Sequence, residues 1–180
     1  LHGCEGTVGG RRIYYERYNQ MLVNLREKFT LRTIYQDESP RESLKVLEKN
    51  QILGILADQD MDWAEGVFIP FFGRPAYTIT APVKLAMASG APIVPVFLVR
   101  LPAGEAGDGP RYRLLVEEPI RVEMKVTREE TIREYTARWS RVVEEKIREY
   151  PEQWAWMHRR WKTVPGPETG VEKAVPTEVR

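Results

Sequence analysis

Two apolar runs with a helix between them constrain the fold more than any other feature of this sequence. The runs QILGILAD (51–58) and PIVPVFLVR (92–100) are almost continuously apolar, which is typical of strands buried on both faces. Between them, Thr80 can cap a helix that continues through Ser89 and ends at Gly90. This order of strand, helix and strand predicts an α/β fold with a mostly parallel sheet flanked by helices. Functional groups are then expected at the ends of the strands.

The segments on either side extend this alternation. Residues 11–29 carry apolar side chains three and four positions apart, which predicts an amphipathic helix, and LRTIY (31–35) follows as a short strand. The sequence SPRE (39–42) combines an N-cap, a proline in the first turn and a later glutamate, so it predicts the start of another helix. RYRLLV (111–116) and PIRVEMKV (119–126) alternate apolar and polar residues, as strands at the margin of a sheet do.

A long helix is predicted near the end of the chain. Thr127 and Glu130 form a capping box at its start, and Pro151 stops it. The phenylalanine-rich stretch before Thr80 is interpreted as a loop. Residues 163–180 contain no aromatic side chain and no periodicity, so they are expected to form a flexible tail.

PEQWAWMHRRWK (151–162) predicts a second, shorter helix with two possible roles. Its apolar stripe would comprise Trp154, Met157 and Trp161, with Arg159, Arg160 and Lys162 nearby. Such a helix can rest on an anionic bilayer surface, where tryptophan lies at the level of the headgroups. The alternative is a tryptophan-rich helix that docks against the sheet.

Composition and the ends of the sequence limit which partners and which kinds of structure can be expected. The 27 basic residues nearly balance the 26 acidic ones, so overall charge gives no reason to expect nucleic acid as a partner. The single cysteine, Cys4, cannot form an internal disulfide. The longest apolar run, 91–99, is too short for a membrane span and contains two prolines. Because the chain begins with Leu1 rather than methionine, we expect an upstream part of the protein to be missing.

Three alternating aspartates, Asp58, Asp60 and Asp62, suggest a cation site. An EF-hand loop beginning at Asp58 would need glycine and glutamate where Trp63 and Ile69 stand, so that interpretation fails. A phosphohydrolase would need a small β-branched residue at the position of Asp62 and further downstream carboxylates. An Asp-x-Asp site of a metal-dependent glycosyltransferase stays open, as does a solvated loop in which the aspartates cap turns.

Four blocks taken in order carry a resemblance. They are GILADQD (54–60), GVFIPFFGRPAYT (66–78), LAMASGAPIVPVFLVR (85–100) and PEQWAWMHRRWKT (151–163). Together they resemble the bacterial lipid A biosynthesis (lauroyl/myristoyl) acyltransferase family, within the lysophospholipid acyltransferase superfamily. The resemblance covers nearly the whole chain before the tail. It implies that residues 1–162 are the C-terminal part of an acyltransferase domain that is truncated at the N-terminus.

The resemblance implies transfer of a fatty acyl chain from an acyl carrier protein thioester to a hydroxyl of a lipid A precursor or related glycolipid. It implies neither a metal nor a cofactor beyond the acyl thioester co-substrate. The expected partners are acyl carrier protein, the glycolipid acceptor and a membrane surface. The expected location is the cytoplasmic face of the bacterial inner membrane, with the protein peripheral or anchored by a missing N-terminal segment.

The catalytic residues implied by the resemblance are absent from this chain. The family uses a histidine with an acidic residue five positions later, but His2 is followed at that spacing by Thr7 and His158 by Thr163. The dyad is therefore expected upstream, and the fragment alone is expected to be inactive.

Substrate binding is assigned, by the same resemblance, to cations for phosphate, polar groups for sugar and aromatic side chains for acyl chains. The residues are Arg12, Asp58, Gln59, Phe68, Phe71, Phe72, Gly73 and Arg74, with Arg11 as an alternative to Arg12. Each has another interpretation: the phenylalanines as core residues, Gly73 as a requirement of backbone geometry, Arg74 as a solvated cation and Asp58 as a turn cap.

Three other functions stay open from the sequence. The acceptor could be a different glycolipid, such as a phosphatidylinositol mannoside. Asp58 and Asp60 could serve a metal-dependent glycosyltransferase or phosphohydrolase. The chain could also be a noncatalytic lipid-binding module.

Overall fold

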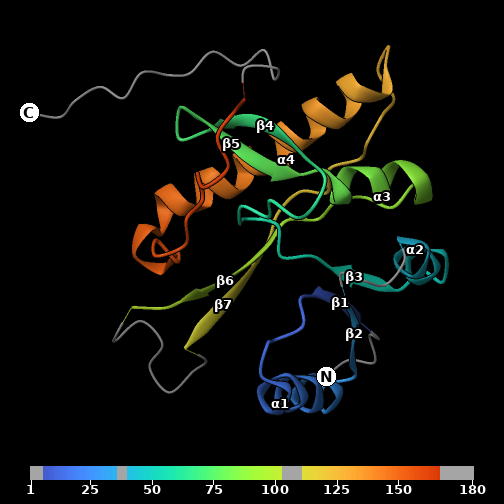
Figure 1. Cartoon of the computed structure of the whole chain (residues 1–180), viewed down its shortest axis with the longest axis vertical. Coiled ribbons are helices and arrows are strands. Elements are labelled where there is room, and N and C mark those ends of the chain that lie inside the picture. The colour runs from blue at the N-terminus through green and yellow to red at the C-terminus, as the bar shows by residue number, and fades with distance from the viewer. Residues whose placement is uncertain (1–5, 36–39, 103–110, 167–180) are drawn as a thin grey trace, which may run out of the picture.

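The computed structural model describes residues 6–35, 40–102 and 111–166, in which helices and strands alternate (Figure 1). The strands are β1 (Gly6–Gly10), β2 (Leu31–Tyr35), β3 (Ile52–Gly54), β4 (Gly66–Phe71), β5 (Arg74–Ile79), β6 (Val96–Arg100) and β7 (Tyr112–Val116). The helices are α1 (Glu16–Glu27), α2 (Pro40–Glu48), α3 (Ala81–Ser89), α4 (Arg128–Glu149) and the 3-10 turn η1 (Pro151–Gln153).

A parallel sheet confirms the predicted α/β fold. β1 lies between β2 and β3 and pairs in parallel with both. β1 itself was not predicted, because its sequence GTVGG has little of the β-branched and aromatic content that marks a strand. The helices at 16–27 and 40–48 lie within the predicted segments. α1 connects β1 to β2, and α2 connects β2 to β3 (Figure 1).

Two antiparallel hairpins account for the remaining strands. The stretch interpreted as a phenylalanine-rich loop forms β4 and β5, which pair from Gly66 opposite Ile79 to Phe71 opposite Arg74. The apolar run 92–100 contributes β6, but its partner is the neighbouring β7 in antiparallel orientation. The predicted strand at 119–126 is wrong, since only Ile120 makes an isolated bridge, to Ile93.

The long helix α4 forms one wall of the core. It crosses the β4–β5 hairpin in Figure 1. Ile132, Tyr135 and Trp139 pack in one cluster with Val83 of α3 and Ile120. Thr80 precedes α3 as predicted, but its hydroxyl donates to the Glu65 carbonyl oxygen at 3.1 Å and makes no side-chain cap.

The N-cap of α4 provides a first prediction. The Thr127 hydroxyl oxygen accepts a hydrogen bond from the Glu130 backbone N–H at 3.0 Å. Thr127→Ala leaves that donor without a protein partner, so the free energy of unfolding should fall by about 1 kcal/mol in urea denaturation. Arg128→Ala, at the exposed neighbouring position, is the control and should have a much smaller effect. Equal losses in both variants would contradict the capping role.

The prediction of a second helix at 151–162 is wrong. After η1, residues 154–166 continue as turns and irregular chain that packs against the β4–β5 hairpin. Thr163 and Pro165 belong to this packed segment, since Thr163 bonds Asp60 and Pro165 is buried. The predicted tail falls mostly on residues 167–180, which lie outside the described residues. Among the helices described, none is long and apolar enough to cross a bilayer.

Candidate functional site

The turn between β4 and β5 has an unusual backbone. Phe72 and Gly73 both have positive φ angles, 50° and 72°, as a two-residue turn of a hairpin requires. Phe72 is a bulky residue in a conformation that favours glycine. Its N–H donates to the Glu144 carboxylate of α4 at 2.8 Å, and its ring lies 4.8 Å from the Arg148 guanidinium carbon. These contacts hold the strained residue in place.

Aromatic side chains from the chain's end surround this turn. The Phe71 ring is buried and lies 6.0 Å from both Trp154 and Trp161. Phe72 adds contacts to Phe71 at 5.0 Å and to Trp156 at 6.2 Å. Phe71 therefore forms part of a packed core with Ala76 and Ile147, as the alternative interpretation of the phenylalanines predicts.

The three aspartates, Asp58, Asp60 and Asp62, form hydrogen bonds or an ion pair with the same C-terminal segment. Asp58 accepts a hydrogen bond from Trp154 Nε1 at 3.0 Å. Asp60 accepts from both the backbone N–H and the hydroxyl of Thr163, each at 2.7 Å. Asp62 pairs with Lys162 Nζ at 2.6 Å, and this bond lowers the pKa of the Asp62 carboxyl. Each carboxylate thus binds a protein donor, and the described residues contain no group of three or more side chains suited to hold a metal ion.

Arg160 lies at the centre of this docked segment, with 1% of its surface exposed. Its guanidinium donates to the Tyr77 carbonyl oxygen and to the Thr78 hydroxyl, both at 2.6 Å, and lies 4.8 Å from the Phe71 ring centre. Burial lowers the pKa of Arg160, while the charges of Asp60 and Asp58 oppose that shift. The buried Arg160 guanidinium and the aromatic packing therefore both hold the C-terminal segment against the β4–β5 hairpin.

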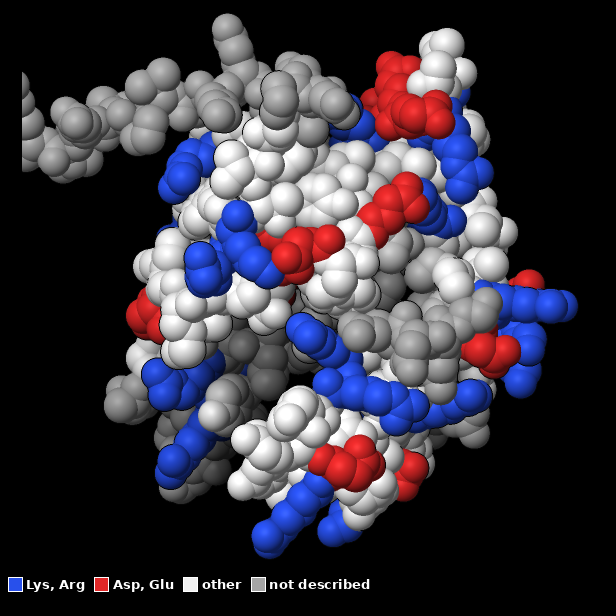
Figure 2. Space-filling view, viewed as in Figure 1, with Lys and Arg blue, Asp and Glu red and all other residues white. Residues whose placement is uncertain are grey.

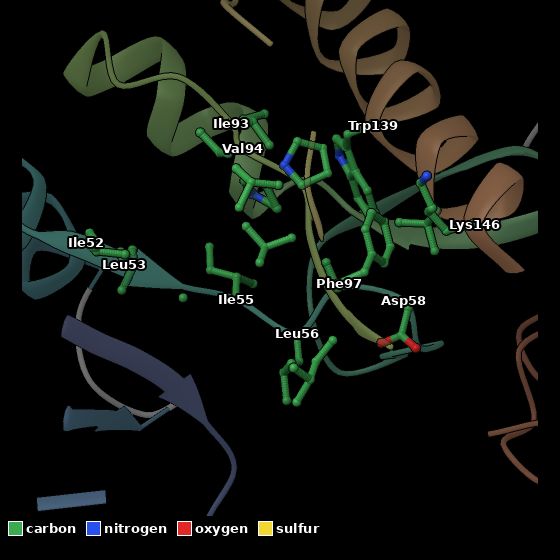
Figure 3. A pocket seen from close by; sticks show the side chains of 18 of the residues that line it. Ile52, Leu53, Ile55, Leu56, Asp58, Ile93, Val94, Phe97, Trp139 and Lys146 are labelled. Carbon is green, nitrogen blue, oxygen red and sulfur yellow. The ribbon is translucent and has the colours of Figure 1, made fainter. Parts of the chain in front are cut away.

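A separate apolar cavity opens beside the docked segment. Its volume is about 930 Å³, within the range of small-molecule sites. The walls come from β3 and the residues that follow it, from the strand region 91–99, and from α3 and α4. Figure 3 shows Ile52 and Leu53 at one end of this cavity, and Ile93, Val94 and Phe97 along it.

Charged side chains lie at the opposite end of the cavity. Figure 3 places Asp58 and Lys146 on the side away from Ile52. Lys146 is held by Glu117 and Glu149, each with a carboxylate oxygen 2.9 Å from Nζ, and these hydrogen bonds raise the pKa of Lys146. The cavity thus offers a long apolar interior with a polar end, which suits an amphiphilic ligand.

The structure brings some of the predicted site residues together and separates others. Phe71, Phe72 and Arg74 meet at the hairpin turn, where the Arg74 guanidinium carbon lies 5.1 Å from the Trp161 ring centre. Asp58 joins this cluster through Trp154 and also lines the cavity. Among the eight predicted residues, Asp58 alone lines the cavity.

The other predicted residues occupy separate positions. Phe68 packs on Tyr77 within the hairpin, at 5.3 Å between ring centres. Gln59 and Gly73 are exposed, and a Cβ on Gly73 would meet nothing within 4 Å. Arg12 is exposed, and its guanidinium carbon lies 4.0 Å from the centre of the Tyr35 ring at the end of β2. The substrate roles of these residues stay predictions.

Sequence analysis missed two features of this region. Arg160 was grouped with Arg159 and Lys162 in a segment for which bilayer contact and docking against the sheet both stayed open, but of these three cations Arg160 alone is buried. The cavity wall around Lys146 was not predicted at all. The density of tryptophan in WAWMHRRW was the available signal for docking, since large aromatic side chains dominate packed interfaces within proteins.

Comparison with known proteins identifies a family and a curated relative. The sequence profile described as bacterial lipid A biosynthesis acyltransferase matches residues 2–163. The lipid A biosynthesis lauroyltransferase of Escherichia coli (strain K12) is 36% identical over 124 residues, which is 68% of this chain and 37% of that protein. The chain therefore spans a little over a third of the length of this curated relative.

Proposed function

Since the chain belongs to the bacterial lipid A biosynthesis acyltransferase family, we propose that it is the substrate-holding part of an enzyme that acylates a lipid A precursor or related glycolipid. The observation that carries this proposal is the apolar cavity with Asp58 and Lys146 at one end. An acyl chain would lie along the apolar interior, because burying each methylene there is favourable by about 0.8 kcal/mol. The thioester or the sugar would then lie toward the charged end.

The reaction requires a general base, and the histidine with an acidic residue five positions later that the resemblance implies does not occur in this sequence. A histidine elsewhere in the full-length gene product, oriented by an acidic partner, would take the proton of the acceptor hydroxyl. The hydroxyl oxygen attacks the acyl carbon, a carbon–oxygen bond forms, the carbon–sulfur bond breaks, and the thiolate receives the proton. We propose an acyl carrier protein thioester as the donor. No metal is needed for these steps.

The proposed location is the cytoplasmic face of the bacterial inner membrane, where a soluble donor and a lipid acceptor can meet. The acceptor phosphates need cations with paired donors, which arginine supplies. Arg74 is suited to this role, because it is exposed at the hairpin turn and its guanidinium is oriented by Trp161. Arg12, or Arg11, is proposed for a second phosphate contact.

The proposed function predicts transfer of label from the acyl thioester to glycolipid by the full-length gene product. The assay supplies phosphorylated lipid A precursors and phosphatidylinositol mannosides in parallel, each with donors of several chain lengths. Acylation of the lipid A precursor is the expected result. Preference for the mannoside would mean that the acceptor is a phosphatidylinositol mannoside rather than a lipid A precursor. Lipid binding without acyl transfer would overturn the proposal in favour of a noncatalytic module.

Arg74→Ala tests the phosphate contact within that assay. We expect kcat/KM for the phosphorylated acceptor to fall about 10-fold or more, as the loss of one charge-assisted hydrogen bond implies. The KM for the acyl donor should change little. Arg121→Ala, another exposed arginine, is the matched control. An equal loss on donor and acceptor, or no loss, would contradict a phosphate role for Arg74.

A further inference from the structure

Helix α1 presents its apolar side to solvent. The exposed fractions of Tyr14, Tyr18, Met21 and Leu25 lie between 52% and 92%. These residues are three or four positions apart, so they form one stripe along the helix and the turn before it. The stripe is the apolar face that an amphipathic helix normally buries. Here no described part of the chain covers it.

The other side of α1 faces the sheet, with Leu22 and Val23 half-buried and polar side chains bonded to neighbouring residues. Asn19 is buried, and its amide nitrogen donates to the Tyr35 hydroxyl at 3.0 Å. Its carbonyl oxygen accepts from the Ile13 N–H at 3.2 Å. Arg26 donates to the Thr33 hydroxyl of β2 at 3.2 Å. These hydrogen bonds fix which side of α1 faces outward, because rotating the helix to bury the stripe would break them.

Charges are arranged unevenly around the stripe. At 100° per residue, Arg17 and Lys28 follow directly beside Met21 on one edge, and both are exposed. Glu16 and Glu27 lie farther round the helix, beyond the polar Gln20 and Asn24 that bond each other at 2.7 Å. Figure 2 shows uncharged, basic and acidic atoms over α1 at the lower edge of the molecule. The edge next to the stripe is thus cationic.

We propose that this stripe, with Arg17 and Lys28, docks on the surface of an anionic lipid bilayer, so that α1 lies in the interface. Exposed apolar side chains bordered by cations are the composition of interfacial helices. Tyrosine fits this position, because its ring can enter the headgroup region while its hydroxyl stays in water. The cationic edge favours anionic lipid over a second copy of the chain, which would bring Arg17 and Lys28 toward like charges. The inference goes beyond the proposed acyl transfer and does not depend on its chemistry.

Site-specific labelling tests this docking in the full-length gene product. Cys4→Ser removes the native thiol of this chain, and Met21→Cys then carries an environment-sensitive fluorophore on the stripe. Glu27→Cys, about 120° round the same helix from Met21 and exposed, is the matched control. The labelled proteins are reconstituted in vesicles of phosphatidylcholine with or without phosphatidylglycerol, and lipid-borne bromine serves as the quencher.

We expect blue-shifted emission and quenching at position 21 in the anionic vesicles, with little change at position 27. Neutralisation by Arg17→Gln and Lys28→Gln should weaken docking by about 5-fold for each cation, or roughly 25-fold together. A label at position 21 that is already shielded in detergent would overturn the proposal, because another protein surface would then cover the stripe. A label that stays in water in every vesicle would also overturn it. Acyl transfer measured in detergent micelles is independent of these results, so the two proposals can fail separately.

Discussion

Replacing Arg160 with alanine is expected to lower the free energy of unfolding by about 3–5 kcal/mol, the range for removing one member of a buried charged network. The substitution leaves the Tyr77 carbonyl oxygen and the Thr78 hydroxyl without their 2.6 Å partner. It also removes the cation that opposes the charges of Asp58 and Asp60. Urea denaturation followed by tryptophan fluorescence measures the loss, since Trp154 and Trp161 belong to the same packed segment.

Arg159→Ala is the matched control, because it removes the same side chain at an exposed neighbouring position. We expect its effect to be about 0.5 kcal/mol or less. Arg160→Lys keeps the charge but lacks the planar fork that reaches two acceptors, so an intermediate loss is expected. Similar stabilities of the Arg160→Ala and Arg159→Ala variants would mean that the docked segment does not depend on the buried guanidinium.

The local elements could be predicted because their signals lie within a few residues of one another. The Thr127 cap and the Gly90 stop after α3 each confirm a prediction made from adjacent residues. The β4–β5 hairpin could not be predicted in this way. Its turn places Phe72 at a positive φ, where turn chemistry leads one to expect glycine or asparagine.

The site depends on contacts between distant parts of the chain, which explains the incomplete prediction there. Asp58 bonds Trp154, and Asp60 bonds Thr163, across about a hundred residues of sequence. No local pattern indicates that alternating aspartates serve to hold a C-terminal segment. Likewise, the periodicity of 151–162 is typical of a helix, whereas long-range bonds to the aspartates hold the segment in an irregular path.

The cavity leads to the second large effect, a change in acyl chain preference. Val94 lines the apolar part of the cavity, and phenylalanine at this position would fill space that the end of a chain is proposed to occupy (Figure 3). Val94→Phe should therefore reduce kcat/KM for the longest accepted acyl donor by about 10- to 100-fold relative to shorter ones, the scale of methylene discrimination in an apolar pocket. The measurement compares acyl carrier protein thioesters that differ only in chain length.

The control must distinguish the effect of filling the cavity from the effect of adding an aromatic ring anywhere on the protein. Val126→Phe makes the same change at an exposed position that does not line the cavity, so its chain-length profile should match that of the unmodified enzyme. A filled cavity acts only on chains long enough to reach Val94, whereas a disturbed fold acts on every donor. An equal loss of kcat/KM for donors of every length with Val94→Phe would therefore show that the cavity does not bind the acyl chain. An unchanged chain-length profile with the protein still folded would show the same. Acyl transfer itself would then have to use a surface elsewhere in the enzyme.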